Sequence, residues 1–213
     1  PHSDAAKAAR LSRETVIVID TSGSMGGESI IQARRAVQHA LTTLRPEDAF
    51  NVIQFSSNFT ALHPSSQPAT TDAIKLASAW VDRLEAGGGT EMLPALEAAL
   101  APGREPRAVR QVIFITDGAV GNEAALFSVL QAKLGTARLY PVGIGSAPNA
   151  HFMTKAAKFG RGTFTYIGQP SEVSEKMSEL FSKIDTPVLH DLRAHWDSDS
   201  VEAWPARIPD VYI

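Results

Sequence analysis

The chain has 213 residues, of which 44% are hydrophobic, 20% charged and 7% aromatic, as expected for one large globular domain with a sizeable core. The formal net charge is −3 and the sequence has no concentrated basic stretch, which argues against a nucleic-acid or anionic-membrane partner. The absence of cysteine excludes disulfide scaffolds, thiolate zinc sites and cysteine nucleophiles.

Short β-branched runs alternate along the chain with longer amphipathic segments, a pattern typical of βα repeats around a mostly parallel sheet. Residues 15–19 read Thr-Val-Ile-Val-Ile, which predicts a central strand buried on both faces. Further strands are expected at 50–55, around 61–62, at 111–116 and 138–143, and at the sheet edge at 162–167. The expected fold is therefore α/β: a Rossmann-like, doubly wound sheet with helices on both faces.

Helical periodicity fills the intervals between these strands. Capping signals mark several ends: Thr70–Thr71 and Ser171 are expected to begin helices, and Gly135 and Gly160 to end helices in the left-handed conformation. The predicted helices span residues 29–44, 74–84, 93–100, 123–134, 149–159 and 173–184.

The sequence pattern divides the chain into three parts. Residues 1–13 are expected to be a linker, 14–185 the folded domain, and 186–213 a truncated C-terminal extension, because the helical register is lost after Asp185. The first residue is Pro1, so we expect a piece of a longer chain whose signal peptide or anchor, if any, lies outside it. Within the sequence, apolar runs are far shorter than the roughly 20 residues of a membrane span.

Oxygen-bearing side chains follow the predicted strands at their carboxyl ends, where open α/β sheets bind ligands. The strand at 15–19 is followed by Asp20, Ser22 and Ser24, the strand at 111–116 by Asp117, and the run Gly87-Gly88-Gly89 by Thr90. Two carboxylates and three hydroxyls are hard donors, which suit Mg²⁺ (or Mn²⁺) and not zinc or copper. The sequence therefore predicts a metal site formed by Asp20, Ser22, Ser24, Thr90 and Asp117.

This constellation resembles the metal-ion-dependent adhesion site of von Willebrand factor A and integrin inserted domains. The resemblance runs from about Glu14 to Asp185, and all five positions match. The stretches at 50–56, 88–90 and 116–123 more narrowly resemble the A domain of inter-α-trypsin-inhibitor heavy chains and their bacterial surface-protein relatives. The segments 186–189 and 208–210 also resemble the stretch that follows the A domain there.

The resemblance implies roles for these residues. The two serines would coordinate Mg²⁺ (alternatively Mn²⁺ or Ca²⁺) directly, Asp20 and Asp117 directly or through water, and Thr90 when ligand is bound. A cation that few carboxylates neutralise would accept an Asp or Glu carboxylate from a protein partner. We therefore expect a non-enzymatic adhesion or protein-binding module that is extracellular or exposed on the cell envelope.

Other functions fit less well. An intracellular assembly factor that partners an AAA-type ATPase could use the same site, and full-length context would separate the two hypotheses. A Mg²⁺-dependent aspartyl-phosphate phosphatase needs a second Asp where Ser22 stands. No nucleophile elbow, P-loop or dinucleotide-binding glycine pattern is present. Glu91 beside the site either repels acidic ligands or favours a helix N-terminus.

Overall fold

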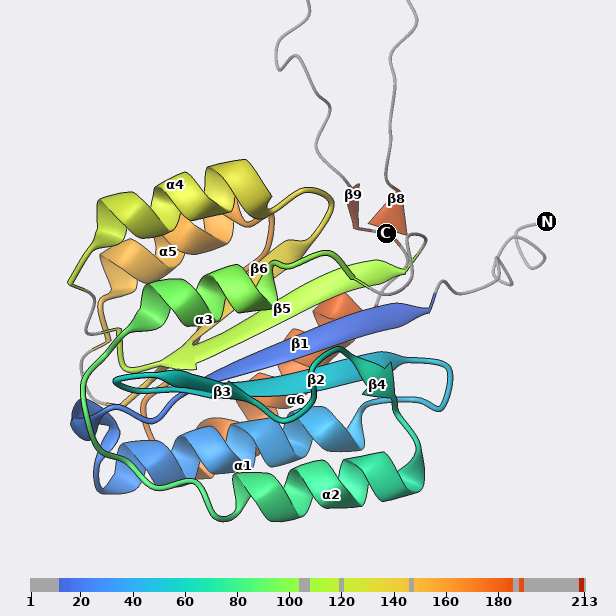
Figure 1. Ribbon diagram of the computed structural model, residues 1–213, viewed down its shortest axis with the longest axis horizontal. Helices are drawn as coiled ribbons and strands as arrows, with labels where there is room; N and C mark the ends of the chain where they lie inside the picture. Colours follow the sequence, from blue (N-terminus) through green and yellow to red (C-terminus); the bar gives the residue numbers. More distant parts are fainter. Residues whose placement is uncertain are drawn as a thin grey trace, which may run out of the picture.

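The structure is a computed structural model that describes residues 12–103, 108–118, 121–145, 148–185, 188–189 and 211–212. In this part of the chain the main sheet has seven strands in the order β3-β2-β1-β5-β6-β7, with β4 also paired to β2 (Figure 1). The strands are β1 (Arg13–Asp20), β2 (Ala49–Phe55), β3 (Phe59–Ala61), β4 (Gln67–Pro68), β5 (Val109–Thr116), β6 (Arg138–Ile144) and β7 (Thr165–Ile167).

Strand β1 lies at the centre of the sheet, and all eight of its residues are buried. It pairs in parallel with β2 on one side and β5 on the other, and β6 and β7 continue the parallel order. Only the short strands β3 and β4 run antiparallel to β2. The predicted central strand and mostly parallel sheet are thus confirmed.

Helices cover both faces of the sheet, so the fold is doubly wound as predicted (Figure 1). Ile17 and Ile19 of β1 belong to a core formed with α1, α2 and α6, whereas Val16 and Val18 belong to a second core formed with α3, α4 and α5. This division follows from the alternation of side chains along a strand. The helices are α1 (Glu28–Thr42), α2 (Thr71–Val81), α3 (Met92–Ala99), α4 (Glu123–Lys133), α5 (Ala150–Phe159) and α6 (Val173–Ile184), with short 3₁₀ turns η2 (Gly23–Met25) and η3 (Pro170–Glu172).

Two of the four predicted helix caps are confirmed and two are wrong. Thr70 caps α2 through its side chain, and Gly135 has a φ of 55°. Gly160 instead has a φ of −74°, and a Cβ there would lie 2.4 Å from that of Leu139, so close packing explains this glycine. Ser171 does not cap α6, because η3 precedes that helix and Gln169 and Glu172 form the capping box.

The edge strand and the chain ends also refine the predictions. Strand β7 is shorter than expected: the N–H of Gly162, the first residue of the predicted strand, donates to the carbonyl of Ala157 in α5 instead of extending the strand. The predicted linker lies mostly outside the described residues, and Arg13 already begins β1. Of the predicted C-terminal extension, the structure describes only β8 (Val188–Leu189) and β9 (Val211–Tyr212), an antiparallel pair. No described helix is both long and apolar enough to span a bilayer.

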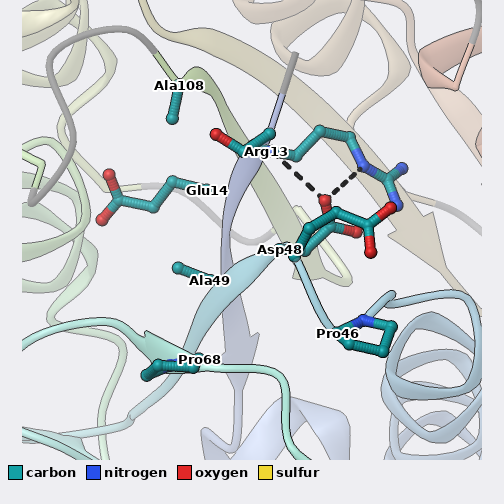
Figure 2. Close-up of a pocket in the computed structure, with 9 residues that line it drawn as sticks. Arg13, Glu14, Pro46, Asp48, Ala49, Pro68 and Ala108 are labelled. Atoms are coloured by element: carbon teal, nitrogen blue, oxygen red, sulfur yellow. Dashed lines mark hydrogen bonds and ion pairs between the residues drawn. The ribbon is translucent and has the colours of Figure 1, made fainter. Parts of the chain in front are cut away.

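A buried ion-pair network holds the amino ends of β1 and β2 (Figure 2). Arg13 Nη2 lies 2.6 Å from Asp48 Oδ2, and Arg13 Nη1 lies 2.6 Å from Asp185 Oδ1 at the end of α6. Arg13 and Asp48 expose only 4% and 3% of their surface. A cavity of about 240 Å³ beside this network is lined by the two residues and by Glu14, Glu47 and Pro68, among others. It lies at the opposite end of β1 from Asp20.

Candidate metal centre

Asp20 is the last residue of β1, and its side chain is completely buried. Its Oδ2 accepts a hydrogen bond of 2.6 Å from the hydroxyl of Thr116, the last residue of the neighbouring strand β5. Its Oδ1 accepts a hydrogen bond of 2.8 Å from the backbone N–H of Ser22. Both carboxylate oxygens are therefore oriented by hydrogen bonds from the chain itself.

The surroundings of Asp20 disfavour its ionised form. Burial raises the pKa of Asp20 above its ordinary value, the hydrogen bonds from Thr116 and Ser22 oppose this shift, and the nearby charge of Asp117 adds to it. Desolvation of a carboxylate is costly unless a cation or hydrogen-bond donors compensate it. A cation beside Asp20 would therefore offset the desolvation cost and stabilise the ionised carboxylate.

Ser22 and Ser24 present two hydroxyls on the tight turn that follows β1. Their Oγ atoms lie 3.0 Å apart, with Ser22 buried and Ser24 exposed. Met25 anchors the turn, because its side chain is completely buried in the core. Mg²⁺ binds oxygens at about 2.1 Å in an octahedral shell, which places adjacent ligand oxygens about 3 Å apart. The two hydroxyls thus fit neighbouring positions of such a shell.

Thr90 is half-buried on a glycine-rich segment that lies against the Ser22–Ser24 turn. The N–H of Gly87 donates to the carbonyl of Thr21 at 2.8 Å, and the N–H of Gly23 donates to the carbonyl of Gly88 at 3.1 Å. Segments more than 60 residues apart in the sequence are thereby joined at the sheet edge. The hydrogen bonds bring the backbone around Thr90 to the site but do not join its hydroxyl to the other four side chains.

Asp117 follows β5 directly and is half-buried. It is near enough to Asp20 for its charge to raise the pKa of that residue. The next residue, Gly118, has a φ of 80°, and its N–H donates to the Thr116 hydroxyl at 3.0 Å. A Cβ on Gly118 would lie 2.6 Å from the backbone nitrogen of Asn149, so the turn after Asp117 requires glycine.

Residues 13–166 match the von Willebrand factor type A domain family. The chain belongs to this family. A von Willebrand factor A domain-containing protein of Dictyostelium discoideum is 30% identical over 93% of this chain and 22% of its own length. Human inter-alpha-trypsin inhibitor heavy chain H4 is 30% identical over 89% of this chain and 22% of its own length. This A domain therefore spans about a fifth of either relative.

Solved structures agree with the A-domain fold. A von Willebrand factor type A protein from Catenulispora acidiphila has a TM-score of 0.72 and 28% identity, over 81% of this chain and 42% of that one. The manganese-loaded TRAP protein of Plasmodium vivax has a TM-score of 0.65 and 21% identity, over 80% of this chain and 74% of that one, and this likeness concerns the fold alone.

The connections around the A-domain site carry only one positive side chain in their sequences. The carboxyl ends of β1, β2, β5, β6 and β7 meet at one edge because these strands are parallel. The connections at this edge, residues 21–27, 56–58, 82–91, 117–122, 145–149 and 168–172, contain a single Lys, Arg or His residue, Arg83. Arg83 is exposed just after the end of α2, and apart from it these connections supply no lysine or arginine that could take the place of a cation beside Asp20.

Four of the five predicted residues, Asp20, Ser22, Ser24 and Asp117, lie in contact or within electrostatic range of one another. The fifth, Thr90, is brought to them by backbone hydrogen bonds of its segment. Among the described residues, no cluster of three or more His, Cys, Asp or Glu side chains occurs, so a metal here would depend on hydroxyl donors. Sequence reasoning missed Thr116, which orients Asp20. Its position directly before Asp117, at the end of a buried strand, was the available signal.

Proposed function

We propose that this A domain holds one divalent cation, Mg²⁺ (alternatively Mn²⁺ or Ca²⁺), and binds an acidic group of a protein partner through it. The observation that carries the proposal is the pair of serine hydroxyls, 3.0 Å apart, on the turn whose first N–H bonds to the buried Asp20 carboxylate. The ligands would be Asp20, Ser22, Ser24, Thr90 and Asp117.

The chain's residues would divide the work between holding the cation and leaving it reactive. Asp20 would supply negative charge to the cation, and its carboxylate is buried and held by Thr116. The serines would supply neutral oxygens. Where Asp20 or Asp117 binds through water, the cation would keep part of its charge and would offer a partner's Asp or Glu an electrophilic position. This arrangement favours recognition over catalysis, so we propose a non-enzymatic binding module.

The comparisons support the proposal at the level of the family. Domains of this family often serve in adhesion or protein binding, and the Plasmodium TRAP structure with the same fold is manganese-loaded. Solved structures of the same fold include a pilus adhesin from Lactobacillus rhamnosus and a minor pilin from Streptococcus sanguinis, which supports a location outside the cell or on its envelope. This chain spans only 22% of inter-alpha-trypsin inhibitor heavy chain H4, so the acidic partner of the whole protein is proposed from the site and not from that relative.

Calorimetric titration with MgCl₂ tests the site. Wild type should bind one Mg²⁺, whereas D20A and D117A should lose this binding and keep the circular-dichroism spectrum of the folded domain. D72A is the matched control, because Asp72 is an exposed carboxylate in the first turn of α2 and should leave Mg²⁺ binding unchanged. Equal Mg²⁺ binding by wild type and D20A would refute the metal site.

Capture of partners on the immobilised domain, with and without chelator, tests the recognition step. Partners retained by wild type in Mg²⁺ should be released by chelator and should not bind D117A. Retention of an ATPase subunit in place of a surface or extracellular protein would favour the assembly-factor alternative. Retention that ignores both chelator and substitution would refute binding through the cation.

A further inference from the structure

The segment that carries Thr90 is held on two sides. On one side, the hydrogen bonds Gly87 N–H to Thr21 carbonyl and Gly23 N–H to Gly88 carbonyl join it to the turn of the two serines. These contacts are made before Thr90 in the sequence. They bring the segment to the site but do not involve Gly89 or Glu91, the residues on either side of Thr90.

The turn between β2 and β3, residues 56–58, supplies that second support. The Ser57 hydroxyl accepts a hydrogen bond of 2.8 Å from the N–H of Gly89, and the Ser56 carbonyl accepts one of 2.7 Å from the N–H of Glu91. Gly89 and Glu91 are the two neighbours of Thr90. Consecutive residues of one turn therefore hold the backbone before and after Thr90.

The approach of the two segments is close enough to require glycine. Gly88 has a φ of 83°, and a Cβ there would lie 2.9 Å from the Ser57 hydroxyl. The supporting turn is itself fixed, because the Ser56 N–H donates to the Asn58 carbonyl at 2.9 Å and the buried Phe55 pairs with Phe59. The Ser57 hydroxyl thus joins the Thr90 segment to a turn that is itself held in place by hydrogen bonds.

We propose that Ser57 is a positioning residue of the metal site, which sets the affinity for Mg²⁺ by holding Thr90 in place. This inference rests on the proposed function. Of the two bonds that flank Thr90, only the one from Ser57 is made by a side chain, so only this one can be removed by substitution. Ser57 is exposed, and water can replace its hydroxyl in the unfolded and folded chain alike. Its loss should therefore affect the site more than the fold.

A double-mutant cycle on the full chain tests this role. Mg²⁺ titrations of wild type, S57A, T90A and S57A/T90A should show S57A weakening the affinity by about 2- to 12-fold, the equivalent of one ordinary hydrogen bond. T90A should weaken it also, and the double variant should bind no more weakly than T90A. S57T keeps the hydroxyl and should restore the wild-type affinity. S65A is the matched control, an exposed serine further along the same hairpin region.

The outcomes separate this inference from the function on which it rests. The positioning role would be overturned if S57A bound Mg²⁺ as tightly as wild type. It would also be overturned if S57A weakened Mg²⁺ binding equally in the wild-type and T90A backgrounds. In either case, D20A would still abolish binding. A wild-type chain that binds no Mg²⁺ would overturn both. Thermal unfolding of each variant shows whether stability has changed, and a fall in melting temperature for S57A that matches its loss of affinity would also count against the positioning role.

Discussion

The hydroxyl of Thr116 donates to Oδ2 of Asp20 at 2.6 Å, across the ladder that joins β5 to β1. The same Thr116 oxygen accepts the N–H of Gly118, so one side chain orients both the carboxylate of Asp20 and the turn that carries Asp117. The two carboxylates of the proposed site are therefore placed by a single residue that would not itself touch the cation.

Without a cation, Asp20 should lower the stability of the domain at neutral pH. The pKa of Asp20 is raised in the folded state, so the folded chain binds this proton more tightly than the unfolded chain does. Protonated Asp20 therefore stabilises the fold at low pH, and this stabilisation is lost as pH rises through the folded pKa. D20N removes the charge, and its amide can accept from Ser22 and donate to Thr116. We therefore expect D20N to melt at a higher temperature than wild type in chelator at pH 7.

The same melts test the cation. Magnesium at 100 times its Kd should stabilise wild type by about 2.7 kcal/mol, because it binds only the folded chain. D20N should not respond. A D20N variant that melts below wild type in chelator, or that gains as much from MgCl₂, would contradict this interpretation of the buried carboxylate.

Replacing Glu91 should alter binding more than folding. Glu91 is exposed at the N-cap of α3, and its side chain makes no capping hydrogen bond, so E91Q should change the unfolding free energy by no more than about 1 kcal/mol through the helix dipole. Removal of this charge beside the site should strengthen acetate binding to the Mg²⁺-loaded domain at low salt, with a difference that fades as salt screens it. A stability loss without a change in acetate binding would favour the purely structural interpretation.

Local sequence signals predicted the elements of this fold but not the contacts between them. The run at 15–19 predicts a central strand because β-branched residues on both faces require burial on both faces, and β1 is buried throughout. The position of Gly160 after a helical stretch predicts a left-handed cap, yet this glycine allows close packing against Leu139, which no local pattern reveals. Likewise, the sequence predicts Thr90 as a ligand but not the contact between Ser57 and Gly89, which lie 32 residues apart.

Stability should fall when the solution is acidified through the ordinary pKa of histidine, partly because of His39. This side chain lies between α1 and α6, with its Nε2 3.2 Å from the Ser178 hydroxyl. Burial lowers its pKa from 6.5 in the folded state, so the unfolded chain binds the proton more readily and stability is lost below about pH 6.5. In urea titrations at pH 7.5 and 5.5, H39Q should lose less stability than wild type. An equal loss in both proteins would show that other groups control this pH range.

Breaking the buried pair Arg13–Asp48 should cost more stability than breaking the exposed pair Arg45–Asp185. D48A removes one of the two carboxylates that pair with the buried Arg13 and leaves Asp185 as the other, so it should cost less than the roughly 3–5 kcal/mol of an uncompensated buried charge but more than R45A in denaturant unfolding. R45A removes one side of an ion pair of 3.2 Å whose residues are 45% and 32% exposed, and should cost no more than about 1 kcal/mol.

The two variants also test whether the ends of the sheet act independently. The Arg13 network lies at the amino end of β1 and the proposed metal site at its carboxyl end, with the fully buried strand between them. Under conditions where D48A remains folded, its Mg²⁺ affinity should equal that of wild type, because no contact of Asp48 reaches Asp20, Ser22 or the Thr90 segment. A parallel loss of Mg²⁺ affinity in folded D48A would show that the foot of β1 controls the site at its other end.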